Sequence, residues 1–134
     1  MSIRGVRGAT AVVTDEVEAI RAATQELLAA LMQANPTLDP ADLASAFFTV
    51  THDLRADYPA LAARAMGWHL VPMLCAQEIP VPGGLPRCIR VLLHWNTELP
   101  QAAIRHVYLG EAASLRPDLA EPMSNPHPIH DGWS

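Results

Sequence analysis

The first part of the chain changes from a strand-like to a helix-like spacing of hydrophobic residues. Residues 3–13 are small or β-branched, with two glycines and two arginines between them, and are predicted to form a strand. Apolar residues then recur at helical spacing over 17–31 until Asn35-Pro36 ends the pattern, which predicts an amphipathic helix. Asp15, with Glu18 three residues later, is expected to cap this helix at its N-terminus.

Three short elements are predicted next. Asp39 before Pro40 is typical of a helix N-cap followed by proline at the first helical position, so a short helix is expected through about Leu43. Residues 45–51 are β-branched and aromatic, which favours a buried strand. The helix formers from Pro59 to Gly67 predict a second helix.

The remaining elements are predicted to be mostly extended. Residues 70–78 are interrupted by Pro72, which favours an edge strand, and 80–86 form a stiff loop. Residues 87–96 alternate between two faces and make the most apolar strand. Residues 105–109 are predicted as a strand, with a helix as a nearly equal alternative. This alternation of strands and helices indicates an α/β or α+β fold with a mixed sheet packed against helices.

Composition limits the classes of protein that remain. The chain has 134 residues, half of them apolar, which fits one domain, assigned to 1–121. Residues 122–134 are rich in proline with little to bury, and are predicted to be a disordered tail. Since 17% of residues are charged and no apolar run reaches the ~18 to 20 residues of a membrane span, we expect neither a disordered chain nor a membrane protein. No secretory signal pattern opens the sequence, so a cytoplasmic location is expected.

Charge and cysteine content narrow the chemistry further. The net charge of -5 argues against nucleic-acid binding, so any anion is bound locally. All nine cationic residues are arginines, which excludes a Schiff-base lysine. Cys75 and Cys88 lack a CxxC spacing, so neither a disulfide framework nor a zinc site is indicated, and buried, inert thiols are expected. His127 and His130 lack further ligands nearby, and we expect no metal.

Four residues are candidates for chemistry. Arg7 and Arg90 each lie among small or apolar neighbours on a predicted strand, where a guanidinium needs a carboxylate, a carbonyl or a bound anion. They are candidates for one anion site; alternatively, each pairs with a protein carboxylate such as Glu78. Glu78 is a candidate base or an acceptor for a substrate hydroxyl, or else a solvated strand end. Tyr108 is a candidate donor to a carboxylate, or packs with its hydroxyl in water.

Four separated blocks of the sequence resemble the monofunctional, trimeric chorismate mutases of the Bacillus type, and the resemblance runs from residue 3 to about 119. The blocks are IRGVRGAT at 3–10, PMLCAQE at 72–78, GGLPRCIRV at 83–91, and RHVYL at 105–109 through LRPDL at 115–119. The resemblance implies a homotrimer of mixed-sheet subunits forming a pseudo-α/β-barrel, with active sites at the subunit interfaces. It also implies the rearrangement of chorismate to prephenate.

The resemblance implies a role for individual residues. Arg7 and Tyr108 would bind a carboxylate of chorismate, Arg90 would bridge a carboxylate and the ether oxygen, and Glu78 would accept from the ring hydroxyl. The rest of the substrate-binding set is Tyr58, Arg64, Met73, Leu74 and Cys75 from the neighbouring subunit, Ala76 and Gln77 beside Glu78, and Leu115 and Arg116 closing over the opening. A pericyclic reaction of a dianion needs no nucleophile, metal or cofactor, only a held conformer and stabilised charge.

Two other classes of function stay open on sequence grounds. One is a trimeric small-ligand binder or imine deaminase of the RidA type, which has a similar subunit shape and one arginine for a carboxylate. The other is a catalytically silent homologue. Two arginines together with Glu78 favour the mutase over the deaminase.

Overall fold

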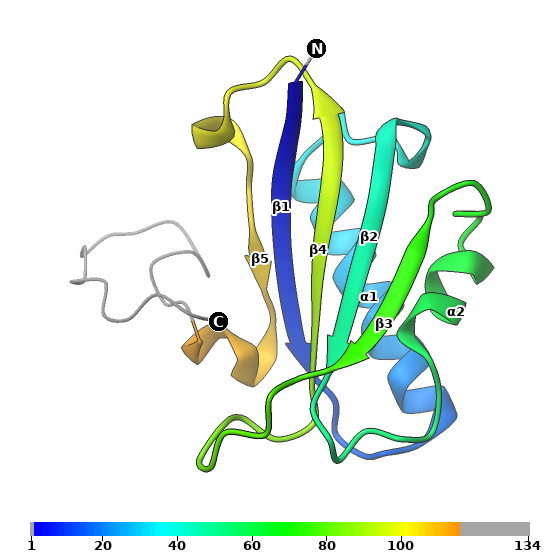
Figure 1. The fold of residues 1–134 in the computed structure, drawn as a ribbon, viewed down its shortest axis with the longest axis vertical. Coiled ribbons are helices and arrows are strands. Elements are labelled where there is room, and N and C mark those ends of the chain that lie inside the picture. The colour runs from blue at the N-terminus through cyan, green and yellow to red at the C-terminus, as the bar shows by residue number, and fades with distance from the viewer. Residues whose placement is uncertain (1, 116–134) are drawn as a thin grey trace.

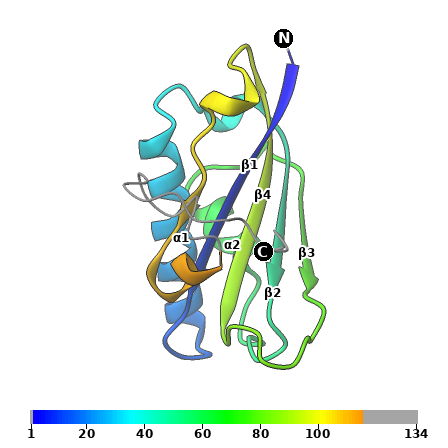
Figure 2. The same ribbon diagram turned by 90° about the vertical axis from the view of Figure 1, so that its left-hand side faces the viewer.

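A five-stranded sheet lies at the centre of the structure, and both α-helices pack against the same face of it (Figures 1 and 2). The structure is a computed structural model that describes residues 2–115. The elements are β1 (Ser2–Ala11), α1 (Val17–Ala34), β2 (Leu43–Val50), α2 (Pro59–Ala65), β3 (Met73–Gln77), β4 (Cys88–Thr97) and β5 (Val107–Tyr108), with short 3₁₀ helices η1 (Pro40–Asp42), η2 (Gln101–Ala103) and η3 (Gly110–Ser114).

The sheet is mixed, as the sequence predicts for an α+β fold. Its strand order is β3-β2-β4-β1-β5. Central strand β4 runs antiparallel to β1 and β2, while β2 pairs with β3, and β1 with β5, in parallel. The edge position expected from Pro72 is confirmed for β3, and the Pro72 carbonyl accepts a hydrogen bond from the Ala46 N–H at 2.9 Å.

Strand alternation gives the sheet two different faces. Ile89, Val91, Leu93 and Trp95 of β4 are buried against the helix side. Residues 88, 90, 92 and 94 therefore point to the opposite side, called the open face below, because side chains alternate along a strand. Figure 2 shows both α-helices on one side of the sheet. The two faces predicted for 87–96 are confirmed.

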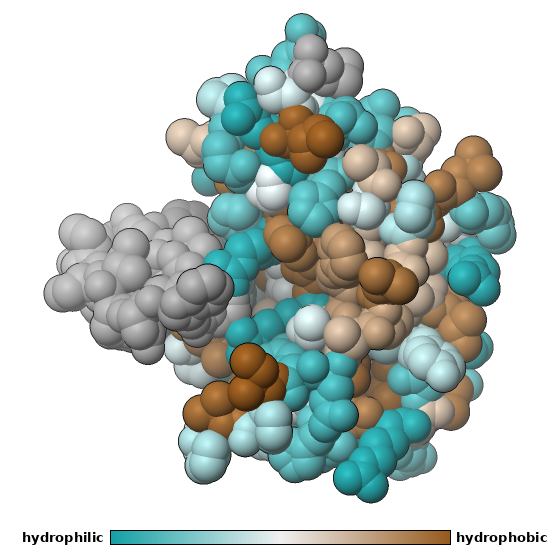
Figure 3. Space-filling model, viewed as in Figure 1, coloured by the Kyte–Doolittle hydropathy of each residue, from teal (hydrophilic) through white to brown (hydrophobic). Residues whose placement is uncertain are grey.

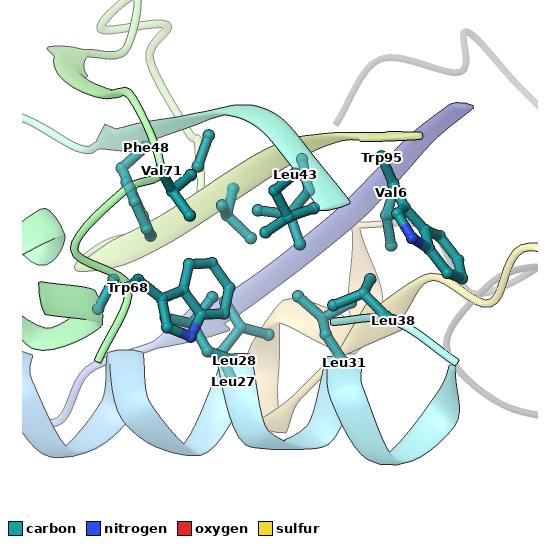
Figure 4. Packing of buried hydrophobic residues seen from close by; sticks show 14 of the residues in the cluster. Val6, Leu27, Leu28, Leu31, Leu38, Leu43, Phe48, Trp68, Val71 and Trp95 are labelled. Atoms are coloured by element: carbon teal, nitrogen blue, oxygen red, sulfur yellow. The ribbon is translucent and has the colours of Figure 1, made fainter. Parts of the chain in front are cut away.

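The main core lies between α1 and the sheet. Leucines of α1 pack against large side chains from the strands and from the loop after α2 (Figure 4). At Gly8 of β1 an added Cβ would lie 2.9 Å from the Leu31 Cδ1 atom and 3.1 Å from the Leu27 Cδ1 atom. Glycine at this position therefore allows α1 to approach β1 closely.

The predicted capping of α1 by Asp15 is wrong. Glu16 occupies the N-cap position, and no side chain caps the helix. The Asp15 carboxylate instead accepts the backbone N–H groups of Arg55 and Ala56 at 2.9 and 3.0 Å. These two donors come from a loop about forty residues further along the chain, and local spacing carries no information about them. The other predicted cap is confirmed, since Asp39 accepts the Ala41 N–H at 2.9 Å.

The segment that begins at residue 105 is extended rather than helical, and the buried side chain of Asn35, the C-cap residue of α1, holds it in that form. The amide of Asn35 accepts the Arg105 N–H and donates to the Arg105 carbonyl, both at 2.9 Å, as a neighbouring strand would. Two residues later, β5 pairs with β1.

The predicted tail 122–134 and Arg116 lie outside the described residues. No helix within residues 2–115 has the length and apolar composition to cross a membrane.

Candidate active site

The register of three neighbouring strands brings Arg7, Arg90 and Tyr108 to the open face. Ala9 of β1 pairs with Arg90 of β4 on one side and with Tyr108 of β5 on the other. Arg7 lies two residues before Ala9 and so shares its face. Both arginines are half-buried, and Tyr108 is 4% exposed. Three of the four candidate residues are therefore neighbours on one surface.

Glu78 joins this group from the far side of β2. It follows β3 directly, and its N–H donates to the Val50 carbonyl at 2.9 Å. Its Oε2 atom lies 3.0 Å from the Arg90 Nε atom, and the two side chains are 16% and 28% exposed. The Nε–H of Arg90 has no aligned hydrogen bond, so the contact is electrostatic rather than directional.

The sequence left open whether Arg7 and Arg90 each pair with a protein carboxylate. Arg90 does so, and its partner is Glu78. Among residues 2–115, no carboxylate forms an ion pair with Arg7. In the described part of the chain, the guanidinium of Arg7 therefore has no carboxylate partner on the open face, and a bound anion would balance its charge.

The backbone of Arg7 is held by a residue that sequence reasoning missed. The Arg7 N–H donates to Nδ1 of His106 at 3.0 Å. His106 precedes β5, so this bond ties the strand carrying Arg7 to the segment carrying Tyr108. Nδ1 must be unprotonated to accept, which places the ring proton of neutral His106 on Nε2. No local pattern in the sequence points to this contact.

Sequence reasoning also missed a group of hydrogen bonds that supports the start of β4, two residues before Arg90. Arg87 has a φ of 46°, and its N–H donates to both oxygens of Asp53 at 3.1 and 3.0 Å. The Thr51 hydroxyl donates to Asp53 at 2.6 Å and accepts the Cys88 N–H at 2.9 Å. Partial burial raises the pKa of the Asp53 carboxyl, but the hydrogen bonds from Thr51 and Arg87 outweigh it, so this pKa lies below its ordinary value of 3.8.

The two cysteines are free and have different surroundings. Cys88 is fully buried on the open face beside Ala9, Tyr108 and Ala112, with Leu115 packed against the same group. Cys75 is half-buried against the main core. Burial raises the pKa of both thiols, which keeps them protonated at neutral pH. Within the described part of the chain, no group of three His, Cys, Asp or Glu side chains could hold a metal ion.

The other predicted site residues lie elsewhere on the molecule. Tyr58 precedes α2 and is 68% exposed, and Arg64 is exposed in the last turn of α2. Met73 and Cys75 pack against the main core, on the helix side of β3. From β3 to β1 there are three strand spacings, roughly 14 Å. The described residues of a single chain therefore do not bring this group to Arg7 and Tyr108.

Leu74, Ala76 and Gln77 lie on β3, which β2 separates from the strand that carries Arg90. The register with β2 places Leu74 and Ala76 on the open face, while Gln77 is exposed at the end of β3. Leu74 adjoins Phe47, which adjoins Leu92, and the three are 64%, 41% and 37% exposed. Figure 3 shows apolar surface across the middle of this face. Phe47, Leu74 and Leu92 thus form a contiguous exposed apolar row on the open face.

Comparison with known proteins gives one consistent family. Residues 3–119 match the family described as chorismate mutase type I. Chorismate mutase AroH of Thermus thermophilus is 56% identical over 117 residues, covering 87% of this chain and 96% of that protein. Chorismate mutase AroH of Bacillus subtilis (strain 168) is 46% identical over 121 residues, covering 90% and 94%. The structure of a chorismate mutase from Clostridium thermocellum matches with a TM-score of 0.80 and 45% identity, covering 82% of this chain and 97% of that one.

Proposed function

The chain belongs to the chorismate mutase type I family of isomerases, and we propose that it converts chorismate to prephenate on the open face of its sheet. The reaction leads toward phenylalanine and tyrosine. The observation that carries the proposal is the grouping of Arg7, Arg90 and Tyr108 around Ala9, with one carboxylate, Glu78, beside Arg90.

The chemistry fits a site without a nucleophile. Chorismate is a dianion, and in its rearrangement the ether C–O bond breaks while a C–C bond forms within the same molecule, with no net gain or loss of protons or electrons. Such a reaction is accelerated by holding the compact conformer and by stabilising negative charge on the ether oxygen. Donors fixed on a sheet do this without reorganising during the reaction.

Each residue then has a defined task. Arg7 and Tyr108 bind one carboxylate, and Arg90 bridges a carboxylate and the ether oxygen. Glu78 accepts a hydrogen bond from the ring hydroxyl. The guanidinium groups of Arg7 and Arg90 on the open face complement the two carboxylates, although the whole chain carries a net charge of -5.

The site is completed by a second copy of the chain. Tyr58, Arg64 and the Met73–Cys75 segment of one copy would face Arg7 and Arg90 of the next, while Leu115 and Arg116 would close over the opening. A head-to-tail contact of this kind joins different surfaces of identical chains, and with a rotation of one third of a turn it closes into a ring, here a homotrimer with three sites. The apolar row Phe47, Leu74 and Leu92 would be buried in the same contact. The two cysteines of the chain are both free, which fits a cytoplasmic location.

The direct test is to mix the purified protein with chorismate and follow the decay of chorismate absorbance. Decay no faster than in buffer would refute the proposed function and leave a ligand binder or a silent homologue. Sedimentation should give a mass of three chains of 14.5 kDa each, and an active monomer would refute the shared site.

A mixing experiment tests the sharing itself. Arg90→Ala and Arg64→Ala are each expected to lower activity. When the two variants are refolded together, a site formed between different copies has both arginines in about a quarter of cases, so activity should return to that level. A site within one copy would give no recovery.

A further inference from the structure

Thr49 lies between Arg90 and the strand that leads to Glu78, although nothing in the sequence singled it out. It stands on β2 directly opposite Arg90 of β4, and on its other side it adjoins Ala76 of β3. Its half-buried hydroxyl donates to the Oε2 atom of Glu78 at 2.8 Å. Thr49 is therefore the residue over which the Glu78 side chain passes to reach Arg90.

The same Glu78 oxygen is shared by two partners of different kinds. Oε2 accepts the Thr49 hydrogen bond and also lies 3.0 Å from Arg90 Nε, which makes no aligned hydrogen bond. Within residues 2–115, Thr49 is the one side chain that makes a directional hydrogen bond to Glu78. A carboxylate and a guanidinium that are free to adjust often pair side by side through two parallel N–H···O bonds. The pair in this site has not adopted that arrangement.

From this geometry we propose that Thr49 is a positioning residue that keeps Glu78 from closing into a two-bond pair with Arg90. With Oε2 held by the hydroxyl, Oε1 remains able to accept from a substrate hydroxyl, and Arg90 retains donors for an anion. The identity of that ligand, a hydroxylated dianion, rests on the proposed function. The open arrangement itself rests only on the contacts of Thr49, Glu78 and Arg90.

Removing the Thr49 hydroxyl should weaken substrate binding more than it slows the chemical step. In Thr49→Val the shape and the strand preference are kept, but Glu78 is free to turn toward Arg90. Substrate must then break the closed pair on binding, so KM should rise and kcat/KM should fall about tenfold, equivalent to about 1.4 kcal/mol. kcat should change by less than about threefold, because the closed Glu78–Arg90 pair stabilises the free enzyme and is already broken once substrate is bound. Thr49→Ser, which keeps the hydroxyl, should remain near wild type.

Two controls separate this role from a merely structural one. Thr14→Val removes another hydroxyl-to-carboxylate bond, from Thr14 to Glu16 at 3.1 Å, which involves neither Glu78 nor Arg90. This variant should leave KM unchanged. In a Glu78→Ala background, Thr49→Val should have no further effect on KM, because it acts only through Glu78.

The experiment combines steady-state kinetics with a crystal structure of unliganded Thr49→Val. The expected structure shows Glu78 and Arg90 joined by two hydrogen bonds. An unchanged Glu78 position, a Thr49→Ser variant as impaired as the valine variant, or full additivity with Glu78→Ala would each overturn the proposal. Thr49→Ala serves the same purpose where valine reduces the yield of folded protein. If the wild type does not convert chorismate, the proposed function fails, while the crystal structures still decide the role of Thr49.

Discussion

Replacing Arg90 with alanine should slow turnover far more than it weakens binding. Arg90 lies on the central strand, between Ala9 and Thr49, with Glu78 against its Nε atom. A guanidinium supported in this way can meet the negative charge that grows on the ether oxygen without moving. That interaction is stronger in the transition state than in the bound substrate, so its loss lowers kcat.

The size of the effect follows from the setting of the side chain. Removing one preorganised donor in a protected site costs about 3 to 4 kcal/mol, or roughly a hundredfold to a thousandfold in kcat. Alanine also leaves the Glu78 carboxylate, 16% exposed, without its cationic neighbour. The Thr49 hydrogen bond and the remaining solvent contact limit this second cost to about 1 to 2 kcal/mol of folding free energy. The protein should therefore stay folded at 25 °C.

Chorismate absorbance decay over a range of substrate concentrations separates kcat from KM, and thermal melting checks the fold. Arg90→Lys should recover only part of the rate, because an ammonium keeps the charge but cannot span two oxygens with a planar fork. Arg7→Ala should act mainly on KM, since carboxylate binding changes little along the reaction. Arg4→Ala, near the other end of β1, serves as an arginine control. If Arg90→Ala raised KM and left kcat unchanged, Arg90 would be an anchor only and the assignment would be wrong.

Three further predictions concern other parts of the molecule. Phe47→Glu places a charge in the apolar row of the open face and should prevent the proposed trimer from forming, leaving inactive monomers with the helix-side core intact; a trimer by sedimentation would contradict the proposed interface. Serine at both Cys75 and Cys88 should keep most of the activity, because burial raises the pKa of both thiols and the reaction needs no nucleophile; a covalent adduct in mass spectrometry would show otherwise. The lowered pKa of Asp53 means that its carboxylate stabilises the fold above about pH 4 and that this contribution is lost as the pH falls further. Asp53→Asn should therefore lower the urea midpoint at pH 7, and this effect should shrink as the pH falls below about 4.

Several site residues could be placed on elements from the sequence, but their neighbours could not. The alternation of 87–96 puts Arg90 on the face opposite Ile89, and Pro72 predicts that the strand leading to Glu78 lies at an edge, both as observed. The sequence allows Arg90 either to pair with Glu78 or to bind an external anion, and only the structure shows that the two side chains meet. Asp15 shows most clearly what local spacing cannot predict. It has the spacing of a helix cap, but its carboxylate accepts hydrogen bonds from two N–H groups far along the chain.

By itself, the sequence determined the periods of hydrophobic residues, most of the helices and strands, and the four blocks shared with the chorismate mutases. These features depend on residues a few positions apart, and their physics is local. Only the tertiary structure decided that Ala9 lies between Arg90 and Tyr108, that Thr49 holds Glu78, and that Tyr58 and Arg64 lie apart from this group. Strand order and register come from pairing between distant segments, which is selected by burial of a common core and leaves no periodic signal in any one segment.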